Sequence, residues 1–143
     1  MNGWLLDTNV VSDLFKRRPD PRLAKWISDR PESDLYLSAF TFAEIGKGVV
    51  KLEAVGDPFA QEVERNAAIL RARYADRILP VDDSVLANWA RITGRAAAAR
   101  IALDSIDQIF AATAITHGLI LATRNLRDFP EIVGVPLVDP WAG

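Results

Sequence analysis

Short, almost fully apolar segments alternate along this chain with longer segments of helical periodicity. The clearest apolar segments are residues 3–6 and residues 119–123, the latter reading LILAT. Strands that are apolar at every position suit a parallel sheet covered on both faces, because neither face meets water. Alternation of such strands with helices is typical of α/β proteins, in which the crossovers between parallel strands are right-handed. The pattern therefore predicts a parallel sheet with helices on both sides.

The predicted elements follow one another without an internal repeat or a long linker. Strands are expected at residues 3–6, 35–38, 77–81, 119–123 and 135–138. A short helix or turn is expected at 7–16, and helices at 21–30, 41–54, 59–76, Asp82 to about Ala99, and 105–117. A chain of 143 residues is long enough to bury a sizeable core, so we expect residues 1–143 to form one domain.

The composition excludes several kinds of site. The chain has no cysteine, which excludes disulfides, thiolate metal sites and cysteine nucleophiles, and its single histidine serves zinc chemistry poorly. No apolar run approaches the roughly 20 residues of a membrane span, and the N-terminus does not read as a signal peptide, so a cytoplasmic protein without membrane association is expected. A net charge of −2 excludes nucleic-acid binding through overall charge alone.

Three acidic residues lie among apolar or small residues, where a carboxylate is unusual. Asp7 ends the first apolar strand, Glu44 lies in TFAEIGKG, and Asp107 begins the helix that contains AATA. A buried charge costs several kcal/mol unless it is paired. Parallel sheets bind ligands beyond the carboxyl ends of the strands, where the strand order reverses. If the strands at 3–6 and 119–123 are neighbours at that point, Asp7 and the polar residues after LILAT meet in one crevice.

A cluster of these carboxylates predicts a site for a divalent cation. Three or four carboxylates in one cleft cannot all be ionised without a cation among them. Ligand sets made only of oxygen suit Mg²⁺ or Mn²⁺. The usual chemistry of such a site is phosphoryl transfer, in which the ion activates water and neutralises charge on the phosphate. Thr8 is expected to orient a neighbouring carboxylate through a hydrogen bond, and Asn9 to help cap the following helix.

Each acidic residue also has a purely structural interpretation. Asp7 and Asp104 are able to cap the helices that follow them, and for Asp104 this interpretation is preferred. An acid in a first helical turn, such as Asp107, is favoured by the helix dipole. Glu44 can face solvent on its helix, and Asp128 can cap a turn.

Four motifs occur in an order that resembles the PIN-domain ribonucleases and, more narrowly, their VapC- and FitB-type toxins. The motifs read LLDTNVVSDL, SAFTFAEIGKG, DQIFAATA and GLILATRNLRDF, and the resemblance extends to LPVD and the closing VDPW. The resemblance implies a three-layer α/β/α sandwich around a central parallel sheet. It also implies Mg²⁺- or Mn²⁺-dependent endonuclease cleavage of RNA.

The resemblance further implies residue roles and partners. Asp7, Glu44 and Asp107 match the three catalytic, metal-binding acids of the family. The fourth position, often acidic in relatives, is Asn125 here, with Asp128 nearby, and Asp104 is either a peripheral ligand or a cap. The partners that the family implies are an RNA substrate, a small VapB-like antitoxin whose tail crosses the cleft, and a second copy of the chain in a homodimer.

Two other functions fit parts of the sequence. A haloacid-dehalogenase-type phosphatase also has an Asp after its first strand, but it needs a second Asp two residues later, where this chain has Asn9. A degenerate PIN domain would bind RNA or a protein without cleavage, and Asn125 at the fourth position motivates that alternative. A dinucleotide-binding protein is disfavoured, because no Gly-rich loop follows the first strand.

Overall fold

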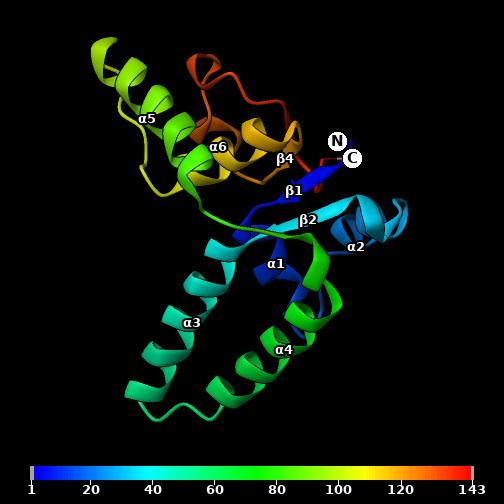
Figure 1. The fold of residues 1–143 in the computed structure, drawn as a ribbon. Coiled ribbons are helices and arrows are strands. Elements are labelled where there is room, and N and C mark those ends of the chain that lie inside the picture. The colour runs from blue at the N-terminus through cyan, green and yellow to red at the C-terminus, as the bar shows by residue number, and fades with distance from the viewer. Residues whose placement is uncertain (1, 143) are drawn as a thin grey trace.

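Five parallel strands form one sheet in a computed structural model that describes residues 2–142 (Figure 1). The strands are β1 (Trp4–Leu6), β2 (Leu35–Ser38), β3 (Ile78–Leu79), β4 (Ile120–Ala122) and β5 (Leu137–Val138). Their order across the sheet is β3-β2-β1-β4-β5, and each pairing is parallel. The predicted parallel sheet is therefore confirmed.

Six α-helices connect and cover these strands. They are α1 (Thr8–Leu14), α2 (Pro21–Ser28), α3 (Ala39–Ala54), α4 (Phe59–Arg73), α5 (Asp83–Ala98) and α6 (Asp107–His117). The helix predicted at 59–76 ends earlier, because Tyr74 turns into the core and a 3₁₀ turn at Ala75–Arg77 leads into β3. The helix predicted from residue 41 begins at Ala39, because the Ser38 hydroxyl accepts the N–H of Phe40 at 3.0 Å and caps it.

The helices form one layer on each face of the sheet. Successive side chains of a strand point to opposite faces, and β1 shows this directly. Leu6 lies in a core with residues of α1 to α4, whereas Leu5 lies in a second core with residues of α5 and α6. The three-layer α/β/α sandwich is thus confirmed. No helix within residues 2–142 has the length and apolar character needed to cross a membrane.

The strand order reverses between β1 and β4. The chain leaves β1 toward β2 and β3 on one side, and it later fills the other side with β4 and β5. Leu6 pairs with Ala122, so Asp7 and Thr123 leave the sheet next to each other. Figure 1 shows α3 and α4 extending from the sheet as an antiparallel pair.

Gly94 lies in the interior of α5, where glycine is less favourable than alanine because folding costs it more backbone entropy. A Cβ atom at this position would meet no atom within 4 Å. We expect Gly94→Ala to raise the free energy of unfolding by about 0.5–1 kcal/mol in urea denaturation. Gly118→Ala is the control and should lower the free energy of unfolding, because Gly118 ends α6 with a φ of 65° that disfavours a Cβ. A Gly94→Ala protein that is no more stable than the parent would contradict this expectation.

Candidate active site

A cleft of about 450 Å³ opens beyond the carboxyl ends of β1 and β4, where the strand order reverses. Asp7 from the end of β1, Glu44 from α3 and Asp107 from the start of α6 all line it. The remaining lining residues are Thr8, Asn9, Ser12, Asp13, Lys16, Arg124, Asn125 and Trp141. The fold thus gathers on one cleft the three acids that the sequence singles out.

Asp7 is buried, and each of its carboxylate oxygens accepts hydrogen bonds. Oδ1 accepts the N–H of Thr8 at 2.7 Å, which caps α1, and Oδ2 accepts the hydroxyl of Thr123 at 2.8 Å. Burial raises the pKa of Asp7 above its usual range, and the negative charges of Glu44 and Asp128 raise it further, against these hydrogen bonds. Asp7 therefore caps a helix and also lines the cleft.

Thr123 is a site residue that the sequence interpretation missed. It is fully buried, and besides donating to Asp7 its Oγ1 accepts the side-chain amide of Asn9 and the backbone N–H of Asn125, each at 3.2 Å. One donated and two accepted bonds use the full capacity of a hydroxyl. The predicted capping role of Asn9 is wrong, because its side chain contacts Thr123 and Asp7 instead. The signal available was Thr123 itself, a hydroxyl residue at the carboxyl end of the LILAT segment.

Glu44 is held by a chain of two threonine hydroxyls. Thr8 Oγ1 donates to Glu44 Oε1 at 2.7 Å, which is the orienting hydrogen bond that the sequence predicts. Thr41 Oγ1 lies 2.9 Å from Thr8 Oγ1 and supplies the hydrogen of that contact, because the Thr8 proton is already committed to Glu44. Thr41 is fully buried and was also missed. The Glu44 carboxylate therefore lies against α1 beside the cleft rather than pointing freely into solvent.

Asp107 has the most strongly perturbed carboxyl in the cleft. Partial burial raises its pKa to about 7, together with the charges of Asp104, Asp7 and Asp128 and a hydrogen bond shared with Asp128. Asp104 Oδ1 accepts the N–H groups of Ile106 at 2.9 Å and Asp107 at 3.0 Å. Asp104 therefore holds the turn that leads into α6, although the residue at the N-cap position itself is Ile106.

The segment after β4 contributes Asn125 and Asp128 in different ways. Asn125 lines the cleft and precedes a 3₁₀ turn at Leu126–Asp128, whereas the Asp128 carboxyl lies beside Asp107. The side-chain amide of Gln108, which is fully buried, donates to the backbone carbonyl of Asp128 at 3.0 Å and holds this turn. Asp128, rather than Asn125, is therefore the additional acid next to Asp107.

The oxygen-rich lining of the cleft fits a hard divalent cation in its chemistry. Carboxylate oxygens are the ligands that Mg²⁺ and Mn²⁺ prefer. Burial raises the pKa values of Asp7 and Asp107, and the negative charges of neighbouring carboxylates raise both further, which is the repulsion that a cation relieves. No group of three or more Asp, Glu or His side chains within residues 2–142 is positioned, as it stands, to hold an ion. The donors are therefore suitable, but they do not form a finished coordination shell.

The raised pKa of Asp107 makes the stability of the metal-free protein depend on pH. Between its ordinary pKa of 3.8 and about 7, the folded state binds a proton that the unfolded state has released. The contribution of Asp107 to the stability of the folded state is therefore present below this range and is lost as pH rises through it. We expect the unfolding temperature of metal-free protein to fall across this range, and to fall less in Asp107→Asn. Equal pH slopes for the two proteins in calorimetry would contradict the expectation.

Known proteins resemble this chain over nearly its whole length. The family profile described as PIN domain matches residues 4–134. The VapC ribonuclease Y4jK of Sinorhizobium fredii is 34% identical, covering 96% of both chains. Toxin FitB of Neisseria gonorrhoeae is 36% identical, covering 96% of this chain and 97% of the relative.

Solved structures agree with these sequence relatives. The crystal structure of FitAcB from Neisseria gonorrhoeae matches with a TM-score of 0.77 at 33% identity, covering 96% of this chain and 98% of that chain. VapBC-1 from nontypeable Haemophilus influenzae, at 23% identity and a TM-score of 0.76 over 100% of both chains, shares the fold. The chain therefore belongs to the PIN-domain family, together with VapC- and FitB-type proteins.

Proposed function

We propose that this protein is a metal-dependent endoribonuclease. The observation that carries the proposal is the convergence of Asp7, Glu44 and Asp107, from three separate elements, on one cleft at the reversal of strand order. The names of relatives support RNA as the substrate. They include VapC ribonuclease Y4jK and the tRNA(fMet)-specific endonuclease VapC of Salmonella typhimurium, which is 26% identical.

The three acids would hold Mg²⁺ or Mn²⁺, and Asp128 would support Asp107 from beside it. The bound ion supplies an activated water and neutralises charge on the phosphate. Thr8 orients the carboxylate of Glu44, and Thr123 orients that of Asp7, so both acids are fixed before RNA arrives. Because burial and neighbouring charges raise the pKa of Asp107 to about 7, its carboxyl would release a proton at neutral pH if a cation were bound.

Incubation of antitoxin-free protein with labelled single-stranded and hairpin RNAs tests this function. We expect cleavage with Mg²⁺ or Mn²⁺ and none after EDTA is added in excess. Full activity in EDTA would contradict the metal-dependent mechanism. Absence of cleavage of every RNA by folded, metal-loaded protein would favour a PIN domain that binds without cutting.

We further propose that a small VapB-like antitoxin keeps the protein inactive by covering an apolar groove next to the cleft. This groove, about 640 Å³ in volume, shares Thr8, Ser12, Lys16 and Glu44 with the cleft. Its apolar side chains come from the residue that follows α1, from α3, from the α3–α4 turn and from α4, and they are Phe15, Ile45, Leu52, Val55, Phe59 and Val63. A partner segment with an apolar face would bury them.

Solved relatives support a partner of this kind. One similar structure, at 26% identity, is described as a toxin-antitoxin complex from Klebsiella pneumoniae. Val55 is 78% exposed and Phe59 is 45% exposed in the isolated chain, so the groove has apolar surface to bury. The homodimer and the cytoplasmic location stay predictions, and light scattering of the purified protein tests the homodimer.

A further inference from the structure

A second groove, of about 500 Å³, runs along the adjoining flank of α3. The residues that line it include Phe40, Ala43, Glu44, Lys47, Lys51 and Ile106. It combines Lys47 and Lys51 with apolar side chains, and Lys51 lies between it and the apolar groove, which it also lines. Its two walls, α3 and the chain before α6, come from widely separated parts of the sequence.

This lysine-bearing groove continues directly from the cleft. Glu44 lines both spaces, and Ile106 in the groove immediately precedes Asp107 in the cleft. A chain bound at the acids would therefore enter the groove between Glu44 and Ile106 without crossing the surface of the molecule.

Lys47 and Lys51 lie one and two helical turns beyond Glu44, on the same face of α3. Both are exposed, and none of the ion pairs formed within residues 2–142 includes either of them. Like charges four residues apart on a helix repel each other, so this pair does not help the helix. A bound anion with several negative charges would remove the repulsion.

The spacing of the two lysines suits a polyanion in an extended conformation. The helical rise of about 1.5 Å per residue places them about 6 Å apart along the axis, comparable to neighbouring phosphates of an extended strand. Ile106 is 43% exposed at the opposite wall, and the ring of Phe40 is held edge-on against Phe110 with centroids 6.2 Å apart. Single-stranded nucleic acids match both the lysines and the apolar side chains of the groove, because their phosphates alternate with apolar base faces.

We infer that this groove binds the RNA strand on one side of the phosphate that is cut. Lys47 and Lys51 neutralise two successive phosphates, and Phe40 with Ile106 contacts a base or sugar. The inference rests on the proposed function, because it takes the cleft as the place of cleavage. It makes the two lysines positioning residues, which hold substrate without touching the reacting atoms.

The salt dependence of RNA binding tests the inference separately from cleavage. A labelled, unstructured oligoribonucleotide is titrated with the full chain in EDTA, where the proposed cleavage does not occur. On single strands each phosphate contact adds about 0.7 to the slope of log affinity against log salt, so Lys47→Gln with Lys51→Gln should lower the slope by about 1.4. Arg65→Gln with Arg95→Gln, on exposed positions of α4 and α5 outside the groove, removes the same charge and should leave the slope unchanged.

Cleavage kinetics give a second readout. With Mg²⁺ present, we expect the lysine double variant to raise KM about tenfold and to leave kcat nearly unchanged, as for loss of phosphate contacts. An unchanged salt slope in that variant, or an equal decrease in the arginine control, overturns the inference and favours a protein in the groove. If the parent protein cuts no RNA yet the lysine variant lowers the slope, the groove is an RNA-binding site, but the proposed nuclease function and the placement of the groove beside a cut phosphate both fail.

Discussion

Asp7→Asn is expected to lower kcat for RNA cleavage by at least about 10²-fold. Removal of one preorganised electrostatic group from an active site typically lowers kcat by that factor or more. The substitution removes the negative charge that faces the cleft. Asparagine caps helices as well as aspartate does, so the contact of the side chain with the N–H of Thr8 is retained and the fold should persist. Single-turnover cleavage with Mg²⁺, together with circular dichroism, measures both effects.

Asp82→Asn is the matched control for this variant. Asp82 also caps a helix, accepting the N–H of Val85 at 3.1 Å, but it lies at the start of α5 and outside the cleft. The same change of charge there should leave cleavage unaltered. Full activity of Asp7→Asn, or equal losses in the two variants, would remove Asp7 from the proposed catalytic site.

Phe59→Asp is expected to weaken binding of the cognate antitoxin by about thirtyfold or more, because an aromatic anchor in an apolar groove contributes about 2 kcal/mol or more to binding. Cleavage should continue at the parental rate and should resist inhibition, since Phe59 lies outside the acidic cleft. The protein should stay folded, because Phe59 is 45% exposed and an acid is favourable in the first turn of α4. Calorimetric titration with the antitoxin measures the affinity.

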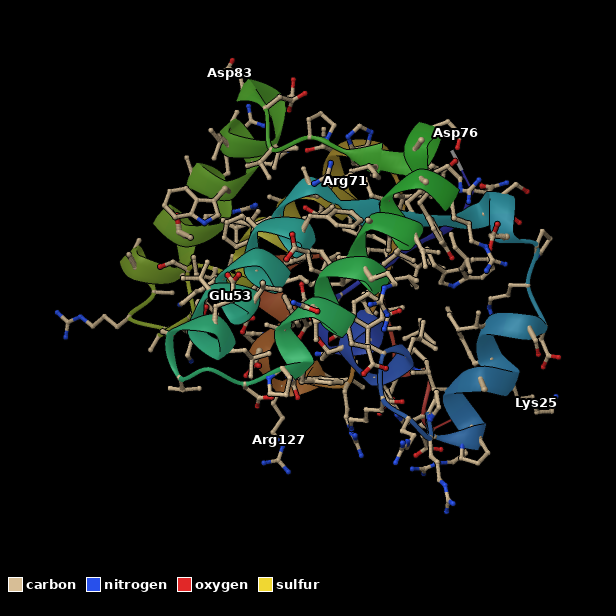
Figure 2. The ribbon with its side chains drawn as sticks, turned by 90° about the horizontal axis from the view of Figure 1, so that it is seen from below. Lys25, Glu53, Arg71, Asp76, Asp83 and Arg127 are labelled. Carbon is tan, nitrogen blue, oxygen red and sulfur yellow. The ribbon has the colours of Figure 1, made fainter. Side chains whose placement is uncertain are left out.

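Ile69→Asp provides the control on the same helix. Ile69 is 60% exposed on α4 and does not line the apolar groove. Figure 2 views the α3–α4 pair from below, with Glu53 on α3 and Arg71 on α4 as landmarks. Equal loss of antitoxin binding in the two variants would show that the antitoxin contacts a different or much wider face.

The parallel sheet and the positions of the three acids could be predicted from the sequence, because both follow from local patterns. Apolar strands define the sheet, and an acid directly after a strand, such as Asp7, stands out against them. The pairing of β1 with β4 then brings Asp7 to the reversal of strand order. The haloacid-dehalogenase alternative was weak because this chain has Asn9 where that family needs a second Asp, and membership of the PIN family replaces it.

The hydrogen-bond partners of the acids could not be predicted, because they depend on register between distant segments. Thr123 reaches Asp7 because Ala122 pairs with Leu6. Thr41 reaches Thr8 because the first turn of α3 lies beside the start of α1. The position of Asp128 beside Asp107 depends on the 3₁₀ turn at Leu126–Asp128, and no periodic pattern in the sequence predicts this turn. Side-chain networks of this kind require the tertiary fold.

We propose that Asp7, Glu44 and Asp107 together hold a divalent cation. Crystals soaked in Mn²⁺ and measured for anomalous scattering test it most directly, because manganese binds the same oxygen ligands as magnesium and is located by its own signal. We expect an anomalous peak in the cleft, within bonding distance of Asp7 and of at least one of the other two carboxylates. A cleft without such a peak at a Mn²⁺ concentration that supports full RNA cleavage would contradict it.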